Sequence, residues 1–386
     1  MDERADGVLI VGASTRALAQ SAARAGFQVR AVDAYGDRDL VACAATIALG
    51  RDLGRPWSAT AAVRVAARVR AAAVAYVSNL ENHPRAVARL ASSRQLWGNP
   101  PTILRQTRDP FQVAAALGQR GIPVPEVRAT PAQENDGRAW LLKPRNSGGG
   151  HGIRHWKAGD NVAHSMYLQQ HIDGVPGSIT FVADGRRAVP LGLSLQLVGE
   201  PAFGVAAFRY CGSLLCGGPA LFAREAALRQ AAENLAATVT ESFELVGVNG
   251  IDFIARDGTP WLVEINPRYS ASMELVEREH GVSIFGLHAD ACRGTLPART
   301  PYCRHLGQVP GKAIVYAPEA GAVESNSIWE PGAVADIPHA GERIPTGKPI
   351  CTVFAKGSSA TDCLETLAVQ AAAVYRATTK FRQSVA

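Results

Sequence analysis

The sequence lacks several features that would assign it to a common class of protein. No apolar run in its 386 residues approaches the roughly 20 residues that a membrane span needs. Residues 1–5 carry charges of both signs and do not resemble an export signal. None of the seven cysteines forms a CxxC pair, so neither a disulfide framework nor a zinc site is indicated. These absences favour a cytoplasmic protein with free thiols and no membrane association.

Lysine is also scarce. Six of the 40 basic residues are lysines, and the formal net charge is +6. This charge is compatible with an anionic ligand such as a nucleotide. Because no dense basic run is interleaved with aromatic residues, the sequence does not indicate binding of nucleic acid.

The common nucleotide-binding motifs are missing too. There is no GxxxxGK[ST] loop, and no GxGxxG follows the first apolar segment. Residues 7–12 nevertheless read GVLIVG, which indicates a buried strand, and a helix over 14–25 and a second strand over 27–33 follow. This βαβ start predicts a parallel sheet.

The distribution of chain breakers predicts three domains. Gly98-Asn99-Pro100-Pro101 is a cluster that ends the first region. Beyond residue 300, glycines and prolines separate short apolar pieces, which is typical of a small β-rich domain. We therefore expect domains over 1–100, 101–300 and 301–386, in line with the length of the chain.

A glycine loop follows a predicted strand in the middle of the chain. Residues 141–152 read LLKPRNSGGGHG. Glycine lets backbone N–H groups approach phosphate oxygens closely, and Lys143 would add a point charge there. A mobile surface loop without a ligand is the alternative interpretation.

A second polar motif lies on a predicted hairpin. Its strands read NGIDFI (249–254) and VEINPR (263–268). Side chains two positions apart share one face of a strand, so Asp252, Glu264 and Asn266 are expected to lie together. Buried carboxylates need a positive partner, and Mg²⁺ suits oxygen ligands. The alternative is the solvent-exposed polar face of an ordinary hairpin.

Together these motifs resemble the ATP-grasp superfamily. LLKPRNSGGGHG, YLQQHIDG (167–174), GIDFI and VEINPR occur in the family's order, over roughly residues 100 to 290. The resemblance implies an α/β ATP-grasp fold with an N-terminal Rossmann-like parallel-sheet domain and a small β-rich C-terminal domain. Both flanks resemble biotin-carboxylase-like carboligases, and within that group the chain resembles the tyramine–glutamate ligases of methanofuran-type cofactor synthesis.

Roles for individual residues follow from this resemblance. Lys143 would contact ATP phosphates and act in catalysis, and Arg268 would stabilise a phosphorylated intermediate. Arg108 stands where many relatives have an ATP-contacting lysine. The glycine loop would cover the phosphates through Ser147, Gly148, Gly149 and Gly150. The nucleoside would contact Gln169, Gln170, Ile172 and Asp173. Mg²⁺, or Mn²⁺ in its place, would bind to Asp252, Glu264 and Asn266.

The resemblance also implies a reaction. The enzyme would activate a small-molecule carboxylate with ATP as an acyl phosphate and join it to an amine, for example glutamate to tyramine or tyrosine. Relatives are often dimers, so a homodimer is a possible assembly. We assign substrate contacts to Arg209, Tyr210, Tyr269 and Ser270.

Three other functions remain open at this point. A related carboxylase would not need an amine, and a sensor would bind ATP without turnover. An NAD-dependent oxidoreductase would use the N-terminal βαβ unit. We also expect Glu81, Asn82 and His83 to cap a helix that begins at Pro84, with lining of a cleft as the alternative.

Overall fold

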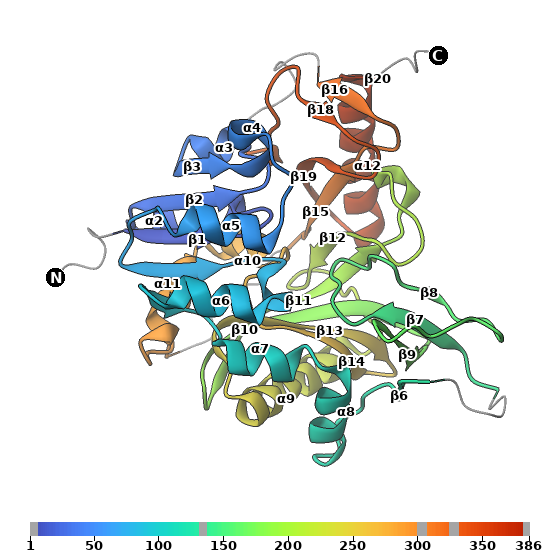
Figure 1. Ribbon diagram of the computed structural model, residues 1–386. Coiled ribbons are helices and arrows are strands. Elements are labelled where there is room, and N and C mark those ends of the chain that lie inside the picture. The colour runs from blue at the N-terminus through green and yellow to red at the C-terminus, as the bar shows by residue number, and fades with distance from the viewer. Residues whose placement is uncertain (1–6, 131–136, 299–306, 324–331, 381–386) are drawn as a thin grey trace.

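A computed structural model of the protein describes residues 7–130, 137–298, 307–323 and 332–380. A parallel sheet built from the start of the chain lies on one side of the molecule (Figure 1). A large antiparallel sheet runs through the middle, and a small lobe of short strands projects beside it.

The N-terminal sheet confirms the predicted parallel arrangement. Its spatial order is β3-β2-β1-β4-β5, with β1 (Val8–Val11), β2 (Val29–Asp33), β3 (Ala45–Ala48), β4 (Ala73–Tyr76) and β5 (Gln95–Trp97). All four residues of β1 are buried, as expected for a parallel strand covered on both faces. The helices of this region are α2 (Arg16–Arg24), α3 (Arg38–Val41), α4 (Leu49–Leu53), α5 (Ala59–Ala66) and α6 (Pro84–Ala91), with the 3₁₀ turn η1 (Leu80–Asn82).

Gly12 and Asp33, at the ends of the first two strands of the βαβ unit, have structural roles. A Cβ atom on Gly12 would lie 2.1 Å from the Val77 side chain, so close packing requires glycine there. The Asp33 carboxylate accepts hydrogen bonds from the backbone N–H groups of Thr15, Tyr35 and Gly36. Asp33 therefore orders the loop beside it instead of facing a free ribose site.

The large sheet contains strands from both the middle and the end of the chain. Its order is β14-β13-β10-β11-β12-β15-β19-β17. The strands are β10 (Val175–Asp184), β11 (Ala188–Val198), β12 (Tyr210–Leu215), β13 (Val246–Arg256), β14 (Thr259–Asn266), β15 (Val309–Tyr316), β17 (Val334–Ala335) and β19 (Pro349–Gly357). Because β15 pairs with β12, residues on both sides of position 300 belong to the same sheet. The domain boundaries given above remain predictions.

The other strands of the described residues form two smaller sheets. The four-stranded one has the order β6-β9-β7-β8, with β6 (Val127–Arg128), β7 (Trp140–Pro144), β8 (Arg154–His155) and β9 (Met166–Gln170). The three-stranded one has the order β18-β16-β20, with β16 (Gly321–Val323), β18 (Arg343–Ile344) and β20 (Thr378–Lys380).

The remaining helices are α7 (Pro101–Thr107), α8 (Pro110–Gly118), α9 (Glu225–Phe243), α10 (Met273–His280), α11 (Ile284–Cys292) and α12 (Ala360–Arg376), with the 3₁₀ turn η2 (Pro201–Phe203). Helices α9, α10, α11 and α12 pack against strands of the large sheet, whereas α7 and α8 pack on α9. The alanine-rich segment between β12 and β13 forms the single helix α9. Leu228 and Val239 of α9 pack on Phe181 and Phe253, which leaves the polar residues of β13 on the opposite face.

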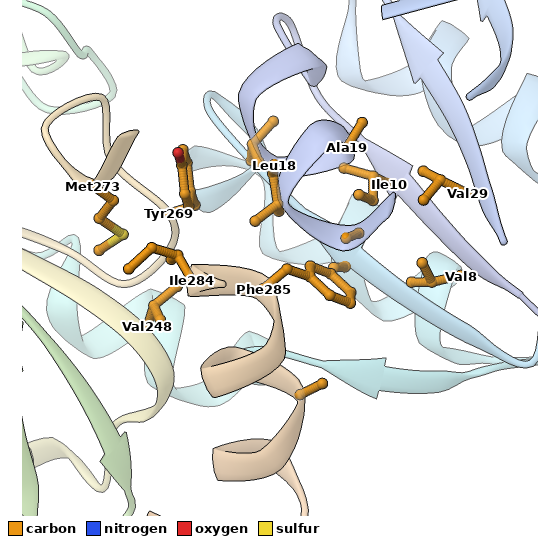
Figure 2. Packing of buried hydrophobic residues seen from close by; sticks show 14 of the residues in the cluster. Val8, Ile10, Leu18, Ala19, Val29, Val248, Tyr269, Met273, Ile284 and Phe285 are labelled. Atoms are coloured by element: carbon orange, nitrogen blue, oxygen red, sulfur yellow. The ribbon is translucent and has the colours of Figure 1, made fainter. Parts of the chain in front are cut away.

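One apolar core joins the N-terminal sheet to the middle of the chain (Figure 2). Val8 and Leu18 come from β1 and α2, while Phe285 comes from α11 and Val248 from β13. Since the two regions share this core, the site between them has a fixed geometry. In the described ranges, no helix combines the length and apolar character of a membrane span.

Candidate functional site

The predicted hairpin forms and brings its polar residues together. Asp252 of β13 is the direct cross-strand partner of Glu264 on β14, and Gly250 is the partner of Asn266. The Asn266 amide donates to the Asp252 carboxylate over 2.9 Å. Gln196 on β11 donates to the other oxygen of that carboxylate over 2.8 Å. Both oxygens of Asp252 are therefore held in place from two sides.

Lys143 reaches the same space from the small lobe. It lies on β7, is 8% exposed, and donates through Nζ to Gln169 Oε1 on β9 over 2.9 Å. Tyr167 of β9 presents its ring 6.0 Å from the same ammonium group. Because the hydrogen-bond partner of this ammonium group is a neutral amide oxygen, an anion such as a phosphate can form a charge-assisted hydrogen bond with it.

Arg108 links three parts of the site. Its guanidinium forms an ion pair with Glu264 and donates to the carbonyl oxygen of Ser147 in the glycine loop over 2.7 Å. Its Nε donates to Asn82 Oδ1 from the N-terminal region over 2.9 Å. A cation therefore occupies the space beside Glu264, and the proposal that Arg108 replaces the missing lysine fits this position.

The two carboxyl groups of the hairpin have opposite pKa shifts. Burial, reinforced by the negative charge of Glu264, raises the pKa of Asp252 to about 6. Burial also acts to raise the pKa of Glu264, but Arg108 and Lys143 outweigh it and the pKa falls below its ordinary value. A divalent cation between the two groups would relieve their repulsion.

Arg268 follows β14 and points back to the N-terminal region. Its Nε and one terminal nitrogen donate to Glu81 over 3.0 and 2.9 Å, and it also donates to Asn266 Oδ1 over 2.9 Å. Glu81 is 1% exposed, and its second carboxylate oxygen has no hydrogen-bond partner. Glu81 therefore does not cap α6, as the sequence had suggested, but orients Arg268.

The glycine loop is docked against the large sheet. The backbone N–H of Tyr210 donates to the carbonyl oxygen of Gly149 over 3.2 Å. A Cβ atom on Gly150 would lie 1.7 Å from the carbonyl oxygen of Phe208, so only glycine permits this approach. The loop thus spans from the small lobe to the start of β12.

A pocket lies between the small lobe and the large sheet. Its polar and charged lining residues include Lys143, Gln169 and Glu264. Further lining comes from the glycine loop, α8 and the end of β14, among other segments, and includes Arg108, Pro110, Val113, Val127, Arg145, Ser147, Gly148, Gly150, Ile153, Tyr167, Leu262 and Ile265. A mainly apolar lining with a few polar and charged groups is typical of a site that binds a small molecule.

Several predicted nucleotide contacts lie outside this lining. Gln170 hydrogen-bonds the backbone of Glu126, Ile172 is buried, and the side chain of Asp173 is 92% exposed beside His171. Their assignment to adenine and ribose therefore remains a prediction that the lining of the pocket does not support.

The four predicted substrate contacts are dispersed. Tyr269 is buried in the core of Figure 2, whereas the Ser270 hydroxyl lies close to Gly250 of the hairpin. Tyr210 hydrogen-bonds Ser213 over 2.9 Å. The Arg209 guanidinium stacks on Tyr316, with its carbon 5.1 Å from the ring centre, and one of its nitrogens is buried without a partner. The Ser270 side chain therefore lies against the hairpin, whereas Tyr269 has a packing role.

The donor set fits Mg²⁺ better than a dedicated protein cage. Within the described residues, no group of three His, Cys, Asp or Glu side chains is placed to hold a metal ion. Asp252, Glu264 and Asn266 provide two carboxylates and an amide. Mg²⁺ is commonly held by one or two carboxylates together with substrate phosphates, so the set fits this ion when a nucleotide is present.

Comparison with known proteins agrees with this geometry. Residues 107–272 match the family model described as the ATP-grasp domain. These residues form an ATP-grasp domain. Among curated sequences, an uncharacterised protein of Methanocaldococcus jannaschii is 33% identical over 120 residues, which are 31% of this chain and 28% of that protein.

Solved structures show the same fold over nearly the whole chain. The biotin carboxylase domain dimer of Hydrogenobacter thermophilus 2-oxoglutarate carboxylase, solved with MgADP and bicarbonate, has a TM-score of 0.72 at 15% identity (97% of this chain, 90% of that one). The L-amino acid ligase of Bacillus licheniformis has a TM-score of 0.69 at 15% identity (98% and 99%). The N5-carboxyaminoimidazole ribonucleotide synthetase of Thermus thermophilus has a TM-score of 0.66 at 17% identity (98% and 100%). The α/β ATP-grasp fold with an N-terminal parallel sheet is therefore confirmed.

The structure adds three residues that sequence reasoning did not assign to the ATP-grasp site. Gln196 holds Asp252, Asn82 holds Arg108, and Glu81 holds Arg268. Glu81 and Asn82 were considered for a cleft, but helix capping was preferred. No local pattern marks Gln196, since alternation along β11 only places it on one of two faces.

Proposed function

We propose that this chain is an ATP-dependent carboxylate–amine ligase that works through an acyl phosphate and releases ADP and phosphate. The observation that carries the proposal is the convergence of Lys143, Arg108 and Arg268 on the carboxylates of Asp252 and Glu264. Three cations around two carboxylates at the end of a pocket suit the binding of a triphosphate with its metal ion.

The chain's own residues would mainly bind and orient the reactants. Lys143 and Arg108 would neutralise phosphate oxygens, while the glycine loop would cover them and exclude water. Asp252, Glu264 and Asn266 would hold Mg²⁺, or Mn²⁺, and the ion would supply charge neutralisation at the phosphates. Arg268, oriented by Glu81, would hold the substrate carboxylate.

The proposed reaction has two steps. A carboxylate oxygen of the acid attacks the γ-phosphorus of ATP, and the bond to the bridging oxygen breaks to release ADP. The amine nitrogen then attacks the acyl carbon, the bond to the phosphate oxygen breaks, and the amine loses a proton. In both steps the protein supplies position and charge, and the scheme requires no covalent attachment to the chain.

We infer the finer assignments from the resemblance noted above. Glutamate joined to tyramine or tyrosine in the synthesis of a C1-carrier cofactor is the first acid–amine pair to test. A homodimer in the cytoplasm is proposed on the same basis, and the dimeric biotin carboxylase domain of similar fold supports it.

A carboxylase is the second candidate, because a biotin carboxylase domain solved with bicarbonate shares the fold. Such an enzyme would carry out the first step with bicarbonate as its acid. A non-catalytic ATP sensor is less favoured, because it would not need the set of Arg268, Asp252 and Glu264 beside the pocket.

ADP release separates these candidates. Purified protein is supplied with Mg²⁺ and ATP together with a panel of acids and amines, beginning with glutamate and tyramine, and with bicarbonate alone. The ligase is supported if an acid and an amine are both required and Glu264→Gln removes the signal. Glu241→Gln is the matched control, since this glutamate forms an exposed ion pair with Arg120. Stimulation by bicarbonate alone would favour the carboxylase, and binding without turnover would favour the sensor.

A further inference from the structure

A second hollow adjoins the proposed nucleotide pocket on the side of the N-terminal region. It is lined by α5, η1, α6, α7 and the first residues of the glycine-loop segment. Arg108, Pro110 and Arg145 line both hollows, so the two are neighbours separated by these three side chains. Helices α6 and α7, which lie side by side in Figure 1, both contribute lining residues.

Three exposed arginine side chains of this second hollow have no partner among the residues that the structure describes. Arg85 and Arg89 lie on α6, one turn apart, and Arg105 lies on α7. In the described part of the chain, none of the three guanidinium groups forms a hydrogen bond or an ion pair. Two like charges at i and i+4 on a helix repel each other, and a third from the next helix adds to this. An anion between the charges would relieve this repulsion through charge-assisted hydrogen bonds.

The acidic residues of the same hollow do not neutralise these arginines. Glu81 is bound to Arg268, and the Asp109 carboxylate caps α8 by accepting from the backbone N–H groups of Phe111 and Gln112. The first turn of α6, which begins at Pro84, also lines the hollow, and the N-terminus of a helix favours negative charge. The three arginine side chains and the dipole of α6 therefore both favour an anion in this hollow.

We propose that this hollow binds a second anionic group, a carboxylate or a phosphate, carried by the acid substrate away from its reacting carboxylate. The assignment to the substrate rests on the proposed function, whereas anion binding by Arg85, Arg89 and Arg105 does not. The reacting group would lie near Arg268, and the distal anion would lie on α6. The acid is then at least a dianion, which excludes simple monocarboxylic acids with a neutral side chain.

Tricarballylate, a small tricarboxylate, is a suitable probe because it is not a nucleotide. Its binding is measured by calorimetry with the full-length chain, with and without saturating Mg²⁺ and ADP, for wild type and for the double variant Arg85→Ala/Arg89→Ala. Arg64→Ala on α5 is the matched control, since Arg64 is exposed and is not among the residues that line the hollow. Inorganic phosphate is titrated in parallel to tell a phosphate preference from a carboxylate preference.

The double variant is expected to weaken tricarballylate binding about tenfold or more, because it removes two charge-assisted contacts, while Arg64→Ala leaves it unchanged. Affinity for ADP should stay the same in all variants. Equal binding by wild type and double variant, or an equal loss in Arg64→Ala, would overturn the site. If ADP fails to bind but tricarballylate binding still depends on Arg85 and Arg89, the proposed function fails and the anion site stands. Thermal unfolding checks that each variant is folded.

Discussion

Asp252 and Glu264 are direct cross-strand partners on β13 and β14, yet their carboxyl groups differ in how readily they ionise. The pKa of Asp252 is raised to about 6 by burial and by the charge of Glu264. Arg108 and Lys143 keep the pKa of Glu264 low despite its burial. One member of the pair is thus stably charged, and the other takes up a proton just below neutral pH in the absence of a cation.

The first prediction concerns the pH dependence of stability in Asp252→Asn. A raised pKa means that the folded state binds more protons than the unfolded state between about pH 4 and 6. The stability contributed by Asp252 is present at low pH and is lost as the pH rises through this range. Relative to Asp252→Asn, the wild type should therefore lose on the order of 1–3 kcal/mol of unfolding free energy from pH 4 to 7. Urea unfolding of the metal-free protein measures this difference.

Asp184→Asn gives a control with the opposite sign. Burial acts to raise the pKa of Asp184, but the hydrogen bonds from the backbone N–H groups of Arg187 and Arg186 outweigh it, so the pKa is lowered. Relative to this variant, the wild type should gain stability as the pH rises towards the ordinary pKa of aspartate and should show no further change above it. The same slope in both variants would contradict the assignment for Asp252.

The second prediction concerns the docked glycine loop. Gly150→Ala places a Cβ atom 1.7 Å from the carbonyl oxygen of Phe208, so the loop must move away from β12. A displacement of this size at the phosphates should reduce turnover about 100-fold and raise the KM for ATP. Steady-state ADP release measures both effects.

Gly149→Ala is the matched control. Gly149 also has a positive φ, 61° against 76° for Gly150, but a Cβ atom there meets nothing within 4 Å. Both variants share the backbone strain of a left-handed alanine, on the order of 1 kcal/mol, and only Gly150→Ala adds the steric clash. Equal losses of activity in the two variants would show that strain, not docking, matters.

Local patterns in the sequence predicted the parts of the site that lie on regular elements. Alternation along two strands placed Asp252, Glu264 and Asn266 on one face, and a strand followed by glycines located Lys143. The end of α5 at Ala66 involves a contact with a later segment of the chain instead. There Arg94 donates to the carbonyl oxygens of Ala66 and Val69, and thereby satisfies the end of the helix.

Contacts between distant parts of the chain could not be predicted in this way. Glu81 and Arg268 are 187 positions apart, and Arg16 and Asp336 are 320 positions apart. Neither pair has a periodic or spacing signal, because both depend on how the N-terminal sheet packs against the rest of the chain. The shared core in Figure 2 fixes that packing, and it became visible only in the structure.

The third prediction tests the role of Glu81 in positioning Arg268. Glu81→Ala removes the acceptor that orients this guanidinium, so kcat should fall about 10- to 100-fold. The KM for ATP should change little, because Glu81 is not among the residues that line the nucleotide pocket. Glu81→Gln retains one acceptor oxygen and should recover part of the activity. A rise in the KM for ATP with unchanged kcat would contradict this role.

The fourth prediction concerns a buried ion cluster that connects the N-terminal region to the large sheet. Glu274 of α10 pairs with Arg16 of α2 and with Lys312 of β15, and Arg16 also pairs with Asp336. The side chains of Glu274, Arg16 and Lys312 are only 6%, 2% and 4% exposed. Burial acts to raise the pKa of Glu274, but the two cations outweigh it and hold the pKa well below its ordinary range.

Removing this carboxylate leaves two buried cations without their partner. Glu274→Ala should therefore destabilise the fold by about 3–5 kcal/mol. The control is Glu279→Ala on the same helix, which removes the partner of the exposed Lys356 side chain and should cost less than about 1 kcal/mol. Because the pKa of Glu274 is lowered, its contribution is present above the ordinary glutamate range and is lost as the pH falls. The difference between wild type and Glu274→Ala in urea unfolding should thus shrink towards acid pH. A difference that stays constant with pH would mean that Glu274 acts through packing and not through its charge.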